Sequence, residues 1–384
     1  MKQVFLDKIT GKIETEDIPL PVLSGKGCVV NTQYSVISSG TETSLILKCR
    51  EGKISKIKRM MPEDGILSYL KRKIKSRSLI KSAKSIASSL NQESQGVSGN
   101  LVPLGYSNAG IIIENDPKIS DINIDDKVAC GGIRHAEFNY VPSNLFTKVP
   151  ENVDLKEASF SALGCIAMQG VRRADVKIGE TIAIIGQGLI GQLAAQLARV
   201  SGAHTIVSDL SSWKLGISKR LGAEKVVNAL ETNAVKEVLK FTNGLGADSV
   251  IICASSSTSR PIKEAIQMVR DKGKIVLVGD VKIEIPREPF YEKELDFLIS
   301  RSYGPGRYDQ LYEQKGLDYP LDQVRWTENR NMEEFIRLLS EGKLNVKDLI
   351  THEFDISNAQ EAYDTIINNP NTTLGVLLKF DQKK

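Results

Sequence analysis

The chain has 384 residues, of which 41% are hydrophobic and 26% are charged, and these values exclude a disordered or low-complexity chain. At roughly 100–200 residues per domain, this length predicts two or three domains. The 51 Lys and Arg nearly balance the 47 Asp and Glu, so the net charge of +4 is too small to indicate nucleic-acid binding by the whole chain.

The five cysteines are scattered along the sequence and never form a CxxC pair. This argues against a disulfide framework or a structural zinc knuckle, and it favours a reducing compartment. The first residues lack the apolar stretch of a signal peptide, and no segment is apolar enough to span a membrane. We therefore expect a soluble cytoplasmic protein without an integral membrane segment.

Short β-like runs punctuated by Gly and Pro occupy residues 1–44 and resume over 101–150, which predicts a small barrel or sandwich. Between them, residues 45–100 carry 13 Lys and Arg against 4 Asp and Glu, with apolar residues mostly at helical spacing. We interpret this segment as a basic helical insertion. It suits a lid that attracts an acidic ligand, a helix on an anionic membrane surface, or a solvated helical face.

From about residue 151, predicted strands alternate with helices, which indicates βαβ units and a parallel sheet. Strands are expected at 181–185, 204–209, 226–228, 249–253, 274–279 and 295–300, and a helix over 189–201. After an aromatic, Arg-rich stretch over 303–330, we expect a helix at 331–341, a strand at 349–354 and a helix at 358–368.

The segment Gly186-Gln-Gly-Leu-Ile-Gly191 is a GxGxxG motif between a predicted strand and helix. Its glycines permit a tight turn, close approach of the backbone to a pyrophosphate and close helix–strand packing. Asp209 ends the next strand, where a carboxylate accepts ribose hydroxyls and repels the 2′-phosphate of NADP. We therefore predict a dinucleotide site that favours NAD over NADP, although Ser208 and Lys214 could each reach a phosphate. The expected cofactor contacts are Gly186, Gln187, Gly188, Leu189, Ile190, Gly191, Asp209, Lys214, Ala254, Ser255, Val278 and Gly279.

Further motifs are Leu221-Gly-Ala-Glu, Gly244-Leu-Gly-Ala-Asp-Ser-Val, Lys272-Gly-Lys-Ile-Val-Leu-Val-Gly and Leu349-Ile-Thr-His-Glu-Phe. With the glycine motif, they make the chain resemble the medium-chain dehydrogenase/reductases, the alcohol dehydrogenase superfamily. The resemblance implies an α/β fold with a GroES-like β-barrel catalytic domain over 1–165 and 305–384. That domain would flank a Rossmann domain, a doubly wound parallel sheet, over 166–304. A homodimer joined at the edge of the Rossmann sheet is also implied.

A closer similarity is carried by Ile37-Ser-Ser-Gly-Thr-Glu42, Pro103-Leu-Gly-Tyr-Ser-Asn108, Tyr303-Gly-Pro-Gly-Arg-Tyr-Asp309 and Val324-Arg-Trp-Thr-Glu-Asn-Arg-Asn331. These segments resemble a zinc-poor branch associated with surface-polysaccharide genes. In that branch the module can be fused to a second oxidoreductase domain. The resemblance therefore implies a role in polysaccharide biosynthesis and raises a separate oxidoreductase as a partner.

At most positions where the family has its zinc ligands, this chain has residues without the metal-binding side chains. The C-G-T-D motif appears as Ser39-Gly-Thr-Glu, and the G-H-E motif appears as Gly105-Tyr-Ser. Only Cys165 stands where the third ligand would be. Because a catalytic zinc needs three protein ligands, we expect no zinc and no other metal.

Without zinc, another group near the nicotinamide must polarise a carbonyl or take an alcohol proton. The resemblance puts Thr41 at the substrate-binding hydroxyl and Tyr106 at a zinc histidine. Tyr106 either acts on the proton, with a pKa lowered by a nearby cation, or fills the space that the metal vacated. Glu42 could be a base or a supporting carboxylate, and His135 could reach the mouth of the cleft. Tyr106, Thr41, Glu42 and His135 are thus the catalytic candidates.

Aromatic rings and Arg side chains gather in the segment 303–330, and this composition suits a sugar or a phosphorylated ligand. The same composition also suits a dimer contact or a loop that covers the cleft. The expected substrate contacts are Ser39, Tyr303, Arg307, Tyr308, Arg325 and Trp326.

These features predict a zinc-independent oxidoreductase that transfers a hydride between NAD(H) and a carbonyl or secondary alcohol, plausibly of a sugar or nucleotide-sugar. One alternative is an NADPH-dependent quinone or enoyl reductase, which Asp209 disfavours. Another is a cofactor-binding partner subunit of a separate oxidoreductase.

Overall fold

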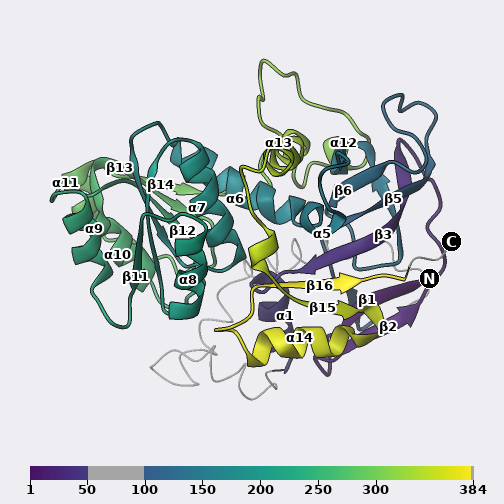
Figure 1. Ribbon diagram of the computed structural model, residues 1–384, viewed down its shortest axis with the longest axis horizontal. Coiled ribbons are helices and arrows are strands. Elements are labelled where there is room, and N and C mark those ends of the chain that lie inside the picture. Colours follow the sequence, from purple (N-terminus) through teal and green to yellow (C-terminus); the bar gives the residue numbers. More distant parts are fainter. Residues whose placement is uncertain (51–98, 382–384) are drawn as a thin grey trace, which may run out of the picture.

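The computed structural model describes residues 1–50 and 99–381, and the strands of this part form three β-sheets. A parallel sheet with its helices forms one side of the molecule, and two largely antiparallel sheets form the other (Figure 1). Helix α6 (Ser161–Ala174) lies between them. The α/β fold with a Rossmann sheet and a separate GroES-like part is the one that the sequence predicts.

The Rossmann sheet contains six parallel strands in the order β11-β10-β9-β12-β13-β14. Their bounds are β9 (Thr181–Ile185), β10 (His204–Asp209), β11 (Lys225–Asn228), β12 (Ala247–Ile252), β13 (Val269–Leu277) and β14 (Asp296–Ile299). In β9, Ile182 and Ile184 join one hydrophobic cluster while Ala183 and Ile185 join another. Both faces of the sheet are therefore buried, which explains the continuous apolar runs.

The helices of this part are α7 (Leu189–Val200), α8 (Ser212–Arg220), α9 (Ala234–Phe241), α10 (Arg260–Met268) and α11 (Arg287–Lys293). The strand order places β9 between β10 and β12, so the winding of the chain reverses there. In open α/β sheets, ligands bind at the carboxyl ends of the strands at such a point. This edge of the sheet is therefore where a dinucleotide site is expected.

The remaining strands form the GroES-like part. One sheet has β1 (Lys2–Asp7), β2 (Ile13–Asp17) and β4 (Leu101–Pro103). The other has β3 (Gly27–Ile37), β5 (Ser107–Asn115), β6 (Lys127–Gly131), β7 (Phe138–Pro142), β8 (Phe146–Lys148), β15 (Ile350–Asp355) and β16 (Gly375–Lys379). The long strand β3 pairs with β5, β7 and β16, so segments from both ends of the described chain meet on it. The helices here are α1 (Thr41–Arg50), α5 (Leu155–Ala158), α12 (Gln310–Glu313), α13 (Glu328–Ser340) and α14 (Ala359–Asn368), with 3-10 turns at Ser143–Leu145, Lys347–Leu349 and Ile356–Asn358.

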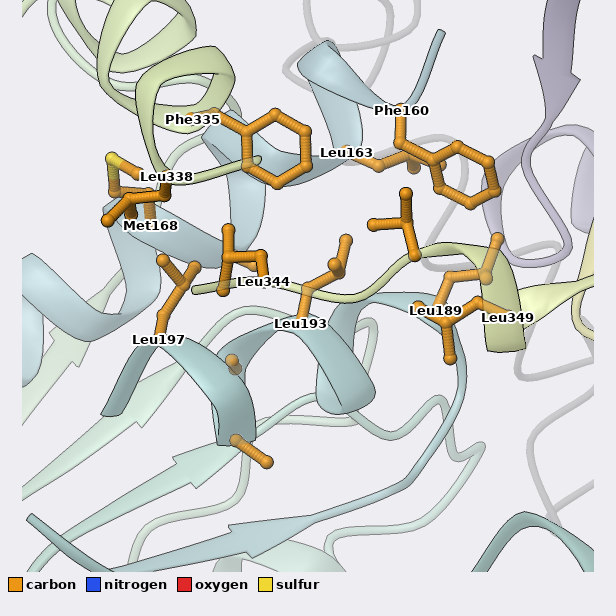
Figure 2. Packing of buried hydrophobic residues seen from close by; sticks show 14 of the residues in the cluster. Phe160, Leu163, Met168, Leu189, Leu193, Leu197, Phe335, Leu338, Leu344 and Leu349 are labelled. Atoms are coloured by element: carbon orange, nitrogen blue, oxygen red, sulfur yellow. The ribbon is translucent and has the colours of Figure 1, made fainter. Parts of the chain in front are cut away.

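A shared hydrophobic core joins the two parts (Figure 2). Leu189, Leu193 and Leu197 recur at every fourth position of α7 and lie in one cluster with Phe335 of α13. A Cβ on Gly164 of α6 would lie 2.3 Å from the Phe335 ring, so glycine is needed where α6 meets α13. This core fixes α6 beside the dinucleotide edge of the Rossmann sheet.

Strands β9 to β14 fall within residues 166–304, while the domain boundaries themselves stay predictions. The predicted insertion over 45–100 lies mostly outside the described residues, and only its flanks, the end of α1 and a turn at 99–100, are described. Among the helices of the described residues, none is both long and apolar enough to cross a membrane. Strand β14 is an edge strand with Ile299 half exposed, and the dimer expected at this edge stays a prediction.

Candidate active site

The glycine motif forms the turn between β9 and α7. Gly186 has a φ of +92°, a conformation that L side chains rarely adopt. A Cβ on Gly191 would lie 1.9 Å from the carbonyl oxygen of Gly186, so only glycine allows this approach of helix and strand. Gly188 caps α7, and a Cβ there would meet nothing within 4 Å. Open space thus lies at the positive end of the helix, as a pyrophosphate cradle requires.

Asp209 ends β10 beside this turn. Its carboxylate accepts hydrogen bonds from the Gln187 N–H at 2.6 Å and the Ser211 N–H at 2.9 Å. Lys214 of α8 is half-buried, and burial lowers its pKa while the charge of Asp209 opposes that shift. The structure therefore brings Asp209 and Lys214 to one corner of the crevice, and Asp209 also braces the glycine turn.

The carboxyl ends of β9, β12 and β13 meet next to the turn. A Cβ on Gly186 would lie 2.7 Å from the Ala254 nitrogen, and one on Gly279 would lie 2.0 Å from the Ala254 carbonyl oxygen. Val278 packs on α6, since a Cβ on Gly170 would lie 2.8 Å from its Cγ2. Ala254, Val278 and Gly279 thus lie together beside the cradle.

Four other predicted cofactor contacts differ in accessibility. The side chain of Gln187 is fully buried, donates to the Gly186 carbonyl at 3.0 Å and accepts from the Ser218 hydroxyl at 3.0 Å. Leu189 is buried in the shared core, whereas Ile190 is half-buried and Ser255 is exposed. Gln187 and Leu189 can therefore face a cofactor only through their backbone.

Tyr106 lies in the turn before β5, and its hydroxyl interacts with the side-chain hydroxyls of Ser38 and Thr41. Burial and the charge of Glu42 raise the pKa of this phenol, and the two hydrogen bonds oppose the shift only in part. No described cation lowers this pKa, and the expectation that the nicotinamide does so stays a prediction. With its pKa raised, the phenol is protonated at neutral pH. Thr41, at the start of α1, is exposed and connects it to solvent.

Glu42 is a buried carboxylate with a complete set of donors. Its Oε2 accepts from the Ser38 N–H at 2.8 Å, and its Oε1 accepts from the Gly105 N–H at 2.8 Å and the Tyr363 hydroxyl at 3.1 Å. His135 Nε2 lies 3.2 Å from Oε1. Burial alone raises the pKa of Glu42, but His135 and the backbone donors outweigh it and lower the pKa. Glu42 therefore ties the turn that carries Tyr106 to α14.

His135 does not reach the mouth of a cleft, which corrects the expectation from sequence. Its side chain is fully buried, and its two ring nitrogens contact Ser35 of β3 and Glu42. Ser35 in turn donates to the Asn108 side chain at 2.8 Å. With both nitrogens engaged inside the protein, His135 positions Glu42 rather than meeting a substrate.

The residues at the zinc-ligand positions do not fit a metal. Cys165 is fully buried, burial raises the pKa of its thiol well above the ordinary value, and its Sγ lies 3.7 Å from the carbonyl oxygen of Glu328. The Ser107 hydroxyl donates to the Ser159 carbonyl at 2.6 Å. Within residues 1–50 and 99–381, no three His, Cys, Asp or Glu side chains are grouped to hold an ion. One thiol with the hydroxyls of Ser39 and Ser107 falls short of the three protein ligands that a catalytic zinc takes.

Part of the aromatic–arginine segment forms a cluster next to Tyr106. The rings of Tyr106 and Tyr303 are 6.2 Å apart, and Tyr303 is buried. The Arg307 guanidinium carbon lies 4.9 Å from the Tyr303 ring and 4.6 Å from the Tyr308 ring. Arg301 lies 4.7 Å from the ring of Tyr308, which is half exposed. Of the predicted substrate contacts, Tyr303, Arg307 and Tyr308 are therefore brought together.

Trp326 and Arg325 form a separate cluster. The guanidinium carbons of Arg172 and Arg325 lie 3.4 Å and 3.9 Å from the centre of the Trp326 ring system. Two arginines thus already contact the ring that was expected to meet substrate, and the role of Trp326 as a substrate contact stays a prediction.

A cavity of about 420 Å³ opens beside the Tyr308 cluster. Arg307 and Tyr308 line it as predicted substrate contacts, and Gln169, Arg173 and Arg301 line it without having been predicted. Gln169 and Arg173 follow Cys165 on α6 at intervals of four, so they share its side of the helix. That spacing is the signal that could have found them.

Glu328, the first residue of α13, is a further group that the sequence reading missed. It is fully buried, and neither carboxylate oxygen has a hydrogen-bond partner among the described residues. Burial and the charge of Glu313 raise its pKa to about 8, against the pull of Arg307. Nothing in the sequence separates it from the acidic residues that ordinarily begin helices.

Comparison with known proteins gives one family match, to the zinc-binding dehydrogenases, over residues 190–315. That range contains none of Ser39, Tyr106, Ser107 or Cys165. The chain is 26% identical over 312 residues to an uncharacterized zinc-type alcohol dehydrogenase-like protein, YdjJ, of Escherichia coli, covering 73% of this chain and 82% of the relative. It is 29% identical over 278 residues to D-guloside 3-dehydrogenase of Escherichia coli, covering 70% and 75% of the two chains.

Among solved structures, the fold matches an Escherichia coli oxidoreductase/dehydrogenase of unknown specificity. The TM-score is 0.74 at 19% identity, and the match covers 100% of both chains. At this identity the likeness bears on the fold alone. The family match and the two relatives make the chain similar to medium-chain, zinc-type alcohol dehydrogenase-like proteins, and the solved structure shares its fold.

Proposed function

We propose that the protein is a zinc-independent oxidoreductase that transfers a hydride between NAD(H) and a carbonyl or secondary alcohol of a sugar or nucleotide-sugar derivative. One observation carries the proposal: the open glycine turn, with the Asp209 carboxylate bonded to its Gln187 N–H, at the carboxyl edge of the parallel sheet. This is where a dinucleotide lies in such folds. When bound, the nicotinamide supplies or accepts the hydride.

The residues of the chain would then handle the proton. The Tyr106 phenol is protonated at neutral pH and can donate a hydrogen bond, then its proton, to a substrate carbonyl oxygen. Thr41 hydrogen bonds with this phenol and is exposed, so it can return a proton from solvent. Glu42 fixes the turn through the Gly105 N–H and, by its charge, keeps the phenol protonated.

Two observations favour a sugar derivative as the substrate. The relative from Escherichia coli that is 29% identical is a D-guloside 3-dehydrogenase, whose name places its chemistry on a sugar ring. The exposed Tyr308 and the arginines around it offer stacking and hydrogen bonds of the kind that sugars take. We extend the proposal to a role in polysaccharide biosynthesis.

Purified protein should contain far less than one zinc per chain, and chelators should leave its activity unchanged. The reason is the donor set at Ser39, Tyr106, Ser107 and Cys165, which offers hydroxyls, a phenol and a buried thiol. Elemental analysis by mass spectrometry and activity before and after dialysis against a chelator check this. Stoichiometric zinc that disappears in Cys165→Ser would contradict it.

Replacing Asp209 by Ala should weaken NADH binding by about 1–3 kcal/mol, the scale of hydrogen bonds to a charged group. Binding of NADPH should be weakened less, or should become tighter, because the carboxylate no longer repels the 2′-phosphate. Fluorescence titration with both cofactors measures the change. Asp209→Asn is the matched control, since it keeps an acceptor for the Gln187 or Ser211 N–H but removes the charge. A wild-type protein that prefers NADPH would show that this interpretation of Asp209 is wrong.

The alternatives differ in chemistry or in partner. An NADPH-dependent quinone or enoyl reductase would have the same pyrophosphate cradle, but it should not prefer NADH over NADPH as we expect from Asp209. A cofactor-binding partner subunit would bind NADH and yet turn over no substrate alone. Turnover of sugar alcohols and of quinones by the isolated chain, with each cofactor, separates the three functions.

A further inference from the structure

The arginine-lined cavity lies at the end of β14, on the side of the Rossmann sheet away from Asp209. Ile299, the last residue of β14, lines the cavity and pairs in register with Leu277 of β13. Leu277 directly precedes Val278 and Gly279, which lie beside the glycine turn. Three strands, β9, β12 and β13, separate β14 from β10, which carries Asp209. A dinucleotide whose ribose lies at Asp209 therefore extends its nicotinamide toward this cavity.

Three arginines converge on the cavity from two elements. Arg173 comes from α6, while Arg301 and Arg307 come from the chain after β14. Arg173 and Arg301 are exposed and form no ion pair with the described residues. Arg301 and Arg307 each lie against the ring of Tyr308, with their guanidinium carbons 4.7 Å and 4.6 Å from its centre. Cations that line one cavity favour an anion inside it.

Acidic side chains nearby neutralise these groups only in part, because Arg307 is ion-paired with Glu313 while Arg173 and Arg301 form no ion pair with the described residues. Asp309 also lines the cavity, but its two oxygens accept from the Tyr319 hydroxyl at 2.5 Å and the Leu311 N–H at 2.9 Å. Arg307 donates through Nη1 to Glu313 at 2.5 Å, and its Nε is buried without a partner among the described residues. Donors for an anion thus remain on all three arginines.

The walls of the cavity suit a group larger than a water molecule. Gly304, Pro305 and Gly306 form part of the lining, and both glycines have a φ of +100°. A Cβ on Gly304 would lie 2.7 Å from Gln169 Oε1, so a larger residue would press into the side of the cavity. A guanidinium fork matches the oxygens of a phosphate, and several forks together suit a dianion.

We propose that this cavity is a subsite for a phosphate monoester group of the substrate, held by Arg173, Arg301 and Arg307. The proposal rests on the proposed function, since it assigns a charged substituent to the sugar derivative whose carbon reacts at the nicotinamide. It gives a role to Arg173 and Arg301, which are exposed and have no carboxylate partner among the described residues. Neither the proton transfer proposed for Tyr106 nor the dinucleotide cradle involves these two arginines.

The test measures binding of methyl phosphate, a minimal phosphate monoester, by ³¹P NMR at pH 8 with saturating NADH to fill the pyrophosphate cradle. Wild-type protein should bind methyl phosphate, and Arg173→Gln and Arg301→Gln should each weaken that binding by roughly tenfold or more. Both side chains are exposed, so neither substitution is expected to disturb the fold. Arg220→Gln, which removes an equally exposed arginine from α8 beside β10, is the matched control and should leave the affinity unchanged.

Absence of binding, or equal weakening by Arg220→Gln, would overturn the subsite. Inorganic phosphate that binds at least tenfold more tightly than methyl phosphate would also overturn it, because the site would then serve the free ion. The same samples are titrated with NADH by fluorescence. If NADH fails to bind while the two arginine variants still weaken methyl phosphate, the cofactor proposal fails and the anion site stands.

Discussion

Tyr106→Phe should lower kcat by roughly 10² to 10⁴, the usual contribution of general acid–base catalysis, with the affinity for NADH unchanged. The substitution keeps the ring, which packs 6.2 Å from Tyr303, and removes only the hydroxyl. The glycine turn is built from other residues, so cofactor binding has no reason to change. Steady-state kinetics on a substrate that the wild type turns over, with NADH titration by fluorescence, separates the two effects.

Thr41→Val is the graded control for this prediction, because it removes the hydroxyl next to the phenol and should cause a smaller loss of kcat. The pH profile adds a second readout. Burial and Glu42 raise the pKa of the phenol above its usual value of about 10, so carbonyl reduction should not lose its acid group below that pH. A Tyr106→Phe enzyme with near-normal kcat would assign Tyr106 to filling space. Glu42 would then be the next group to test.

Glu42→Ala should cost about 3–5 kcal/mol of unfolding free energy at pH 7, the range for removing one partner of a buried, bonded charge. The loss leaves the N–H groups of Ser38 and Gly105, the Tyr363 hydroxyl and His135 without their acceptor. Glu42→Gln, which keeps the shape and one acceptor oxygen, should lose less. Urea denaturation of the three proteins, followed by fluorescence, measures the differences.

The pH dependence of this effect has a definite sign. The folded pKa of Glu42 lies below the value of about 4.3 expected in the unfolded chain. The carboxylate therefore contributes fully above that value, and its contribution is lost as the pH falls through the folded pKa. The difference in unfolding free energy between wild type and Glu42→Gln should become smaller under acid conditions. A gap at pH 7 of less than about 1 kcal/mol for Glu42→Ala would mean that the bonds around Glu42 are worth no more than exposed ones.

The Rossmann part was predictable because a short stretch of sequence is enough to predict each of its elements. Its buried strands are short apolar runs, and the turn at Gly186 needs glycines for steric reasons, so it is marked by the GxGxxG motif. Predicted strand ends differ from the observed ones by a few residues, as in β13, which begins at Val269 rather than 274. The helix expected over 331–341 begins earlier, at Glu328, because Thr327 caps it through a hydrogen bond to the Arg330 N–H.

The candidate site was less predictable because its contacts join distant segments. Glu42 and His135 are 93 residues apart, and Glu42 and Tyr363 are 321 apart, so no local spacing reveals that they bond. The burial of Glu328 and the contact of Arg172 with Trp326 depend likewise on how α6 and α13 pack. Residue types predicted which groups could do chemistry, while tertiary packing decided which of them face one another.

The pairing of β16 with β3 has a consequence for the order in which the chain folds during synthesis. Residues 34–37 bond to residues 376–379, so the central strand of the GroES-like part waits for a partner made some 340 residues later. The six Rossmann strands, by contrast, lie within 181–299 and can pair as soon as that stretch has left the ribosome. Until β16 is synthesised, the edge of β3 at residues 34–37 lacks this partner and can pair with other strands, so aggregation is a greater risk for the GroES-like part than for the Rossmann part.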